Sequence, residues 1–291
     1  MKSLAPVFCA LTLLAVSSVH AEEPASWSQP RQPFRIHGNT WYVGTQGLSA
    51  ILVTSPQGHV LIDGTLEGNA AQIEANIQRL GFRLQDVRVI LNSHAHSDHA
   101  GAIAKLARDS GAKVLASAAG APALRTGGDD PGDPQRDEDL RFPPVAGVEV
   151  IGDGESVRVG PLELIARYTP GHTPGSTSWT WQSCEQGRCL DIAYPDSLTA
   201  ISSEGFRFSD DAEHPHRVED FRQSFATVAA LPCDILITPH PEASGFMEKI
   251  ALRDRTGDAA ALRKPGACRD YAEGARKLFD KRLEQEGREQ R

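Results

Sequence analysis

Beyond its first 21 residues, the chain has no apolar run of the roughly 20 residues that a membrane-spanning helix needs. Cysteine is scarce, with 5 in 291 residues, and no pair shows the C-x-x-C spacing of a cysteine-ligated zinc site. Positive charge is also in short supply, because 30 lysines and arginines stand against 38 acidic residues and leave a net charge of −8. A membrane-embedded protein and a nucleic-acid-binding protein are therefore both disfavoured.

The first 21 residues predict a cleaved secretory signal. Lys2 precedes an apolar run over residues 4–16, and small residues lead up to Ala21. A membrane-spanning helix is the weaker alternative because the run is too short, and a lipid anchor at Cys9 is disfavoured because that cysteine lies inside the run. We expect residues 1–21 to be removed on export to the periplasm, and residues 22–291 to form one domain that is not attached to the membrane.

The remaining composition is that of an ordinary globular protein, with 40% hydrophobic and 23% charged residues. After loss of Cys9, four cysteines stay in an oxidising compartment, which allows three disulfide connectivities. Cys184 and Cys189 flank a short turn and could close a small loop, which would leave Cys233 to pair with Cys268.

Apolar residues recur with the periods of strands and helices along most of the chain. In the first half we predict strands at 41–43, 50–53, 59–63, 87–91 and 114–116, with helices around residues 73–80 and 103–110. In the second half we predict strands at 148–151, 156–159, 162–168, 177–181 and 235–237, a helix at 218–231 and a charged helix at 271–286. Residues 24–33 read as an irregular arm, and residues 126–134 as a surface loop able to rim a pocket. The two halves share one α/β plan.

A histidine-rich cluster follows the strand predicted at 87–91. His94, His96, Asp98 and His99 stand at a junction between strand and helix, and burying such groups together is costly unless a cation orders them. His94 and His96 point the same way in an extended chain and can bind one ion, whereas Asp98 and His99 can face a second. Nitrogen-rich ligation with one carboxylate favours zinc over magnesium or calcium and leaves iron and manganese open.

Two further histidines follow strands in the second half. His172 lies in a tight loop of prolines and glycines, and His240 lies just past the strand at 235–237. Taken singly, each would more often be an ordinary core or surface histidine. Together with the cluster they complete two sets of three ligands.

With these motifs the sequence resembles the metallo-β-lactamase superfamily over nearly the whole chain after residue 21. The resemblance implies an α/β fold of the αββα four-layer type, in which two mixed sheets lie face to face between helix layers and the metals lie at one sheet edge. It also implies two zinc ions per chain. The first would be held by His94, His96 and His172, and the second by Asp98, His99 and His240.

Within the family, the complete H-x-H-x-D-H cluster and the absence of a zinc-binding cysteine resemble subclass B3. A second subclass has cysteine where this chain has Ser197, and a third has asparagine where this chain has His94. The resemblance implies that Ser197 and Thr199 bind the carboxylate of the substrate, against the simpler alternative of a plain hydroxyl-rich turn. Gln135 is a weaker substrate-binding candidate at the pocket rim.

The disulfides of the family are also informative. Pairing of Cys233 with Cys268 matches a bridge that is common in subclass B3, and pairing of Cys184 with Cys189 matches one found in only some members.

The function that the resemblance implies is hydrolysis of the β-lactam ring of penicillins, cephalosporins and carbapenems by a zinc-bound hydroxide, which confers antibiotic resistance. Asp98 would be catalytic, because it stands beside the second zinc and can relay a proton to the departing ring nitrogen. The expected partner is a small-molecule substrate and not nucleic acid, and we expect a monomer.

Two alternatives remain. A thioester hydrolase resembling glyoxalase II, or a lactonase, would use a bridging carboxylate such as Asp196, but the secretory signal and the Ser-Leu-Thr context disfavour it. The more remote alternative is a non-catalytic zinc-binding module. Structural zinc sites usually have four protein ligands, whereas sets of three leave a position open for water.

Overall fold

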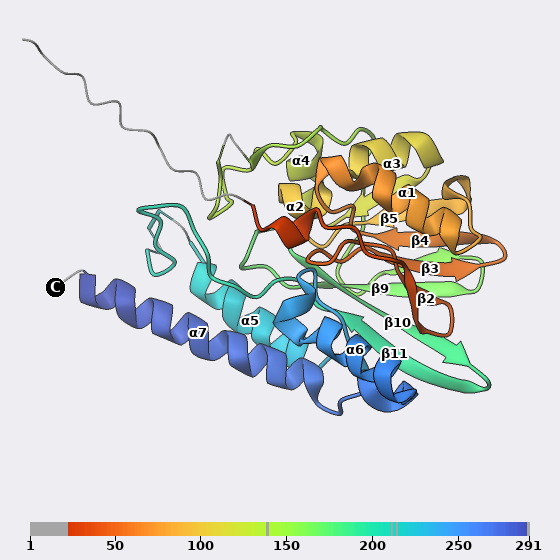
Figure 1. Ribbon diagram of the computed structural model, residues 1–291. Helices are drawn as coiled ribbons and strands as arrows, with labels where there is room; N and C mark the ends of the chain where they lie inside the picture. The colour runs from red at the N-terminus through yellow and green to blue at the C-terminus, as the bar shows by residue number, and fades with distance from the viewer. Residues whose placement is uncertain (1–22, 138–139, 211, 214, 290–291) are drawn as a thin grey trace, which may run out of the picture.

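The computed structural model describes residues 23–137, 140–210, 212–213 and 215–289, so the predicted signal at residues 1–21 lies outside the described residues. Two sheets lie face to face at the centre of the molecule, and helices cover the outer face of each (Figure 1). This is the αββα arrangement that the sequence predicts. Among the described residues, no helix combines the length and the apolar character needed to cross a membrane.

The first sheet has seven strands in sequence order. They are β1 (Phe34–His37), β2 (Thr40–Tyr42), β3 (Ile51–Ser55), β4 (Gly58–Ile62), β5 (Val87–Leu91), β6 (Lys113–Ala116) and β7 (Glu149–Val150). Strands β1 to β4 pair antiparallel, and β4 to β7 pair parallel. Parallel neighbours need crossover connections, and helices supply them. These helices are α1 (Ala70–Arg79), α2 (Ser97–Ala100), α3 (Ile103–Ser110) and α4 (Gly120–Arg125).

The second sheet has five strands in the order β12-β11-β10-β9-β8. They are β8 (Ser156–Val159), β9 (Leu162–Tyr168), β10 (Thr177–Glu185), β11 (Arg188–Tyr194) and β12 (Ile235–Leu236). Only the β11–β12 pair is parallel. The helices of this half are α5 (Arg217–Ala229), α6 (Phe246–Thr256) and α7 (Ala267–Glu289). Short 3-10 turns lie at Ala25–Trp27, Glu67–Asn69, Leu84–Asp86, Pro241–Ser244 and Ala259–Leu262.

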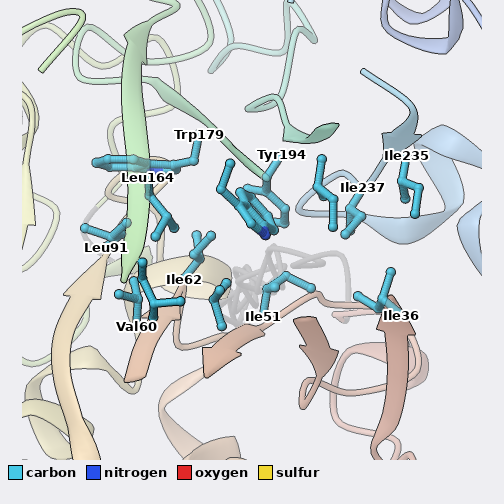
Figure 2. Packing of buried hydrophobic residues seen from close by; sticks show 14 of the residues in the cluster. Ile36, Ile51, Val60, Ile62, Leu91, Leu164, Trp179, Tyr194, Ile235 and Ile237 are labelled. Carbon is cyan, nitrogen blue, oxygen red and sulfur yellow. The ribbon is translucent and has the colours of Figure 1, made fainter. Parts of the chain in front are cut away.

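The core lies in three apolar layers, one between the sheets and one beneath each helix layer. Strand β3 shows why, because successive side chains of a strand point to opposite faces. Ile51 and Val53 contact the layer between the sheets, and Leu52 contacts the layer beneath α1 and α3. Trp179 and Tyr194 reach the same central layer from the second sheet (Figure 2). A strand buried on both faces reads as a continuous apolar run.

The structure adds elements that the sequence patterns did not predict, namely β1, β11, α4 and α6. Strand β11 mixes polar with apolar residues because its first two residues are exposed, and α4 has only six residues. The strand predicted at 148–151 is reduced to β7, Glu149–Val150. Each of these elements depends on a neighbouring strand or helix more than on a periodic pattern of its own.

Both expected disulfides are present. Cys184 and Cys189 are register partners across the β10–β11 hairpin, and Cys233 joins the segment before β12 to Cys268 in the first turn of α7. The second bridge spans 35 residues, against 5 for the first. Restriction of the unfolded chain grows with the length of the closed loop, so the two bridges differ in their expected effect on stability.

We predict that replacing Cys233 and Cys268 together with serine lowers the free energy of unfolding by about 2–4 kcal/mol. The same change at Cys184 and Cys189 should cost less, because the loop it opens is shorter. Urea denaturation of the two double variants, followed by circular dichroism, makes the comparison. An equal loss in both variants would contradict the loop-length argument.

Candidate metal centre

The histidine cluster lies where the first sheet meets the second, on the segment between β5 and α2 and in the first residues of α2. Asp63, just after β4, fixes the start of this segment. Its carboxylate accepts hydrogen bonds from the Ser93 backbone amide at 2.7 Å, from the Ser93 hydroxyl at 2.7 Å and from Asn92 Nδ2 at 3.1 Å. The Tyr194 hydroxyl at the end of β11 donates a further bond at 2.8 Å, so both sheets contribute to the support.

His94, His96 and His172 come together as the first predicted ligand set. Their ligand atoms lie within 4.8 Å of one another, and the ring centroid of His94 lies 4.6 Å from each of the other two rings. His94 is buried, and its Nε2 atom has no hydrogen-bond partner within the described part of the chain. An unpartnered buried nitrogen facing two other imidazoles is a favourable position for a metal ion.

The other ring nitrogen of each of these histidines contacts an oxygen atom of a residue that is not one of the three ligands. His94 Nδ1 lies 2.7 Å from Asp196 Oδ1, and His96 Nε2 lies 2.7 Å from Asp133 Oδ2. His172 Nδ1 lies 2.9 Å from the carbonyl oxygen of Thr199. Such acceptors fix both the tautomer and the orientation of a metal-binding imidazole.

Asp98, His99 and His240 converge as the second predicted set. Asp98 Oδ2 lies 3.0 Å from His99 Nε2 and 3.2 Å from His240 Nε2, and the two nitrogens are 3.2 Å apart. The ligand atoms of His94, Asp98 and His99 also lie within 4.8 Å of one another, so the two sets adjoin at His94. Side chains from α2 and from the segment after β12 thus complete the centre.

The pKa values of His94, His172 and Asp98 favour zinc binding, whereas the pKa of His99 is raised, because the lowering effect of burial is outweighed by the facing Asp98 carboxylate. Burial lowers the pKa of His172 to about 3 and, with the neighbouring imidazoles, holds the pKa of His94 well below its usual value. Burial alone would raise the pKa of Asp98, but the facing His99 and His240 hold it well below its usual range. Neutral imidazoles and an ionised carboxylate are the forms that bind a metal ion, and a nitrogen-rich set with one carboxylate favours zinc. The residues present therefore fit the group that the sequence implies.

A cavity of about 550 Å³ opens onto both sets. Its wall includes His96, Asp98, His172 and His240, together with the three residues expected to bind substrate, Gln135, Ser197 and Thr199. Gln135 Nε2 is buried and has no hydrogen-bond partner among the described residues, so it can serve a bound ligand. The Oγ1 atom of Thr199 lies 3.1 Å from His172 Nδ1, a second contact that the sequence did not indicate.

The sequence patterns did not predict the supporting contacts that three acidic residues make in this region. Asp63 and Asp133 were not predicted as part of the site, and Asp196 was considered only as a bridging ligand. The structure buries all three, and each carboxylate accepts from a group on the histidine-bearing segments. The available signals were weak: Asp63 ends a strand, and Asp133 and Asp196 each stand within two residues of a predicted substrate-binding residue.

The fold and the adjoining donor sets define the chain as an αββα protein with a metal centre at the sheet edge. A family model described as the metallo-beta-lactamase superfamily matches residues 43–240. The chain belongs to this superfamily, as the motifs predict.

Solved structures of metallo-beta-lactamases are similar over most of their length. The Rm3 metallo-beta-lactamase is 50% identical with a TM-score of 0.88, and the match covers 90% of this chain and 97% of that one. MEM-A1, a subclass B3 metallo-beta-lactamase from a soil metagenome library, is 48% identical with a TM-score of 0.87 and coverages of 90% and 99%. MIM-1 from Novosphingobium pentaromativorans is 46% identical with a TM-score of 0.85 and coverages of 90% and 93%.

Curated relatives match shorter regions. A hydroxyacylglutathione hydrolase from Anaeromyxobacter dehalogenans (strain 2CP-C) is 37% identical over 95 residues, which are 33% of this chain and 29% of that protein. The uncharacterized protein YobT of Bacillus subtilis (strain 168) is 31% identical over 151 residues, 48% of this chain and 59% of that protein. The chain therefore spans less than two thirds of the length of both.

We predict that Asp133→Asn weakens zinc binding about 10- to 100-fold, because the amide is a poorer acceptor for His96 Nε2 and holds that ring less firmly. Competition with a chromophoric chelator measures the affinity without reference to turnover. Asp129→Asn is the matched control: Asp129 lies on the same loop and pairs with Arg136 and Arg141, away from the histidines. Equal losses in both variants would show that the loop, not the Asp133 contact, supports the metal.

Proposed function

We propose that the chain is a zinc-dependent hydrolase that opens the β-lactam ring of antibiotics and confers resistance to them. The observation that carries this proposal is the similarity, at 46–50% identity over about 90% of the chain, to solved metallo-beta-lactamases, one of them described as subclass B3. The two donor sets at the cavity wall supply the residues that such chemistry needs.

Each donor set would hold one zinc ion, giving two per chain. The first ion would be bound by His94, His96 and His172, and the second by Asp98, His99 and His240. Bound zinc lowers the pKa of water to about 7 and polarises a carbonyl group. Asp133, Asp196 and Thr199 orient the three imidazoles of the first set by accepting hydrogen bonds from the ring nitrogens that would not bind the ion.

The cavity residues bind and orient the substrate. The Ser197 and Thr199 hydroxyls are the proposed donors to the substrate carboxylate, and Gln135 Nε2 offers a further donor at the rim. Asp98 also lines the cavity, so its carboxylate can hold the proton that the ring nitrogen takes up as the carbon–nitrogen bond breaks.

The position of Asp196 argues against the thioester-hydrolase and lactonase alternatives. That mechanism needs a carboxylate between two metal ions, whereas Asp196 is fully buried and directs Oδ1 to His94 Nδ1, on the side of the ring away from Nε2. The match to a hydroxyacylglutathione hydrolase also covers only a third of the chain. A non-catalytic module is disfavoured because ligand residues of both sets line an open cavity.

We further propose that the protein acts as a monomer in the periplasm on small-molecule substrates, without nucleic acid. Two disulfides suit an oxidising compartment, and the secretory pattern over residues 1–21 would deliver the chain there. The net charge of −8 opposes binding to a polyanion.

Metal removal is the direct test of the proposed function. Dialysis against a chelator should abolish hydrolysis of a penicillin, a cephalosporin and a carbapenem, and readdition of zinc should restore it as two ions per chain are taken up, measured by elemental analysis. A serine-directed acylating inhibitor should leave the activity unchanged. Turnover by the metal-free protein, or a covalent acyl adduct in the mass spectrum, would refute the proposal.

We predict that Asp98→Ala is far more damaging than Ser197→Ala. Loss of Asp98 leaves only His99 and His240 for the second ion, so kcat should fall roughly 100-fold or more together with zinc content. Loss of the Ser197 hydroxyl removes one charge-assisted hydrogen bond, worth about 1.5–3 kcal/mol, and should raise KM with little change in kcat. Steady-state kinetics with parallel zinc analysis decide between the two. Near-normal kcat and two bound ions in Asp98→Ala would contradict the assignment of the second set.

A further inference from the structure

The described residues between β11 and α5 form neither helix nor strand. We call residues 199–209 the 199–209 loop. It begins at Thr199, and Ile201, 55% exposed, stands on the cavity wall. A segment without a backbone ladder of its own keeps its position only through contacts with the rest of the molecule.

The start of this loop is tied to the metal centre. His172 Nδ1 contacts the carbonyl oxygen of Thr199 at 2.9 Å, and the Ser203 amide donates to the carbonyl oxygen of Pro134 at 2.8 Å. Pro134 lies between Asp133, which holds His96, and Gln135 at the rim. A displacement of the loop would therefore reach two of the expected ligands and the cavity wall.

The far end of the loop is tied to helix α7 by the buried ring of Phe208, which packs against Phe279, and by an ion pair. Glu286, 1% exposed, accepts from the Phe208 amide at 3.2 Å, the Ser209 amide at 2.9 Å and Arg282 Nε at 2.6 Å. Arg282 Nη2 donates to Ser202 Oγ at 3.0 Å and to the carbonyl oxygen of Phe206 at 2.9 Å. We call this pair the Glu286–Arg282 clamp. The C-terminal end of α7 and the connection between β11 and α5 lie on the same side of the molecule (Figure 1).

Contacts other than the clamp also hold helix α7 in place. The Phe279 side chain is buried against the rings of Phe221 and Phe225, and the Cys233–Cys268 bridge fixes the start of α7. A buried carboxylate is costly unless its oxygens are satisfied, and here the loop amides and Arg282 satisfy them. Burial raises the pKa of Glu286, but these donors together hold it below its usual value. Apart from their contact with each other, Glu286 and Arg282 thus form their hydrogen bonds with residues of the 199–209 loop.

We propose that the Glu286–Arg282 clamp is a positioning device for substrate binding, which fixes the 199–209 loop so that Thr199 keeps its contact with His172 and Ile201 keeps its place on the cavity wall. Neither clamp residue lines the cavity, so both act through the loop. The clamp's effect on KM rests on the proposed hydrolase function, whereas its effect on the order of the loop does not.

The test compares the zinc-loaded full chain with Glu286→Gln and, as a second variant, Arg282→Lys. The amide introduced by Glu286→Gln replaces one acceptor oxygen by a donor, and lysine lacks the forked guanidinium that reaches Ser202 and Phe206. In both variants we expect amide exchange in residues 199–209 to accelerate about tenfold. We expect KM for a penicillin to rise about tenfold, while kcat and zinc content stay within about twofold.

Asp280→Asn is the matched control. It breaks the exposed Arg276–Asp280 pair on the same helix and should change neither exchange in the loop nor KM. Unchanged exchange in both clamp variants would show that the clamp does not hold the loop. Faster exchange with unchanged KM, or parallel losses of kcat, zinc content and thermal stability, would also overturn the proposal. If the unmodified chain hydrolyses no β-lactam, the proposed function fails, and the exchange comparison still decides whether the clamp positions the loop.

Discussion

The metal centre depends on one buried carboxylate, that of Asp63. It lies after β4 at a φ of +62°, a backbone conformation that non-glycine residues rarely adopt. Burial raises its pKa to about 6, and such a group is tolerated only where donors surround it. The donors come from Asn92 and Ser93 at the end of β5 and from Tyr194 at the end of β11. The cost of burying Asp63 is thus offset by contacts that join the two sheets next to His94.

Besides the Asp63 contacts, each histidine of the first ligand set has a hydrogen-bond acceptor for its other ring nitrogen, and these acceptors lie on separate segments of the chain. Asp196 follows β11, Asp133 stands on the loop after α4, and Thr199 begins the 199–209 loop. Each acceptor fixes one imidazole that comes from a different part of the chain than the acceptor itself. Correct orientation of the three rings therefore requires the folded sandwich, and no short peptide containing the histidine cluster would reproduce it.

The sequence was sufficient for features whose signal is local. The apolar strands, the H-x-H-x-D-H spacing and the even set of cysteines each point to their structure, because alternation, ligand type and redox chemistry are properties of the residues themselves. The contacts of Asp133 and Glu286 could not be predicted from the sequence. An aspartate in a polar loop and a glutamate in a charged helix look like solvated residues, and only the fold buries them. Strand β11 was missed for a related reason, since its pairing with β10 and β12 identifies it.

In this protein, loops that form the cavity wall also support the histidines of the metal centre, so the binding loops and the scaffold are not separate parts. Two of the loops at the cavity contact a metal-centre histidine, one through Asp133 and the other through Thr199, and a hydrogen bond from Ser203 to Pro134 joins these two loops. The cavity wall is therefore also part of the support of the first ligand set. A substitution that breaks the Asp133 or Thr199 contact therefore acts on the orientation of His96 or His172 as well as on the cavity wall, whereas a substitution farther along the loop can alter the wall while both contacts stay in place.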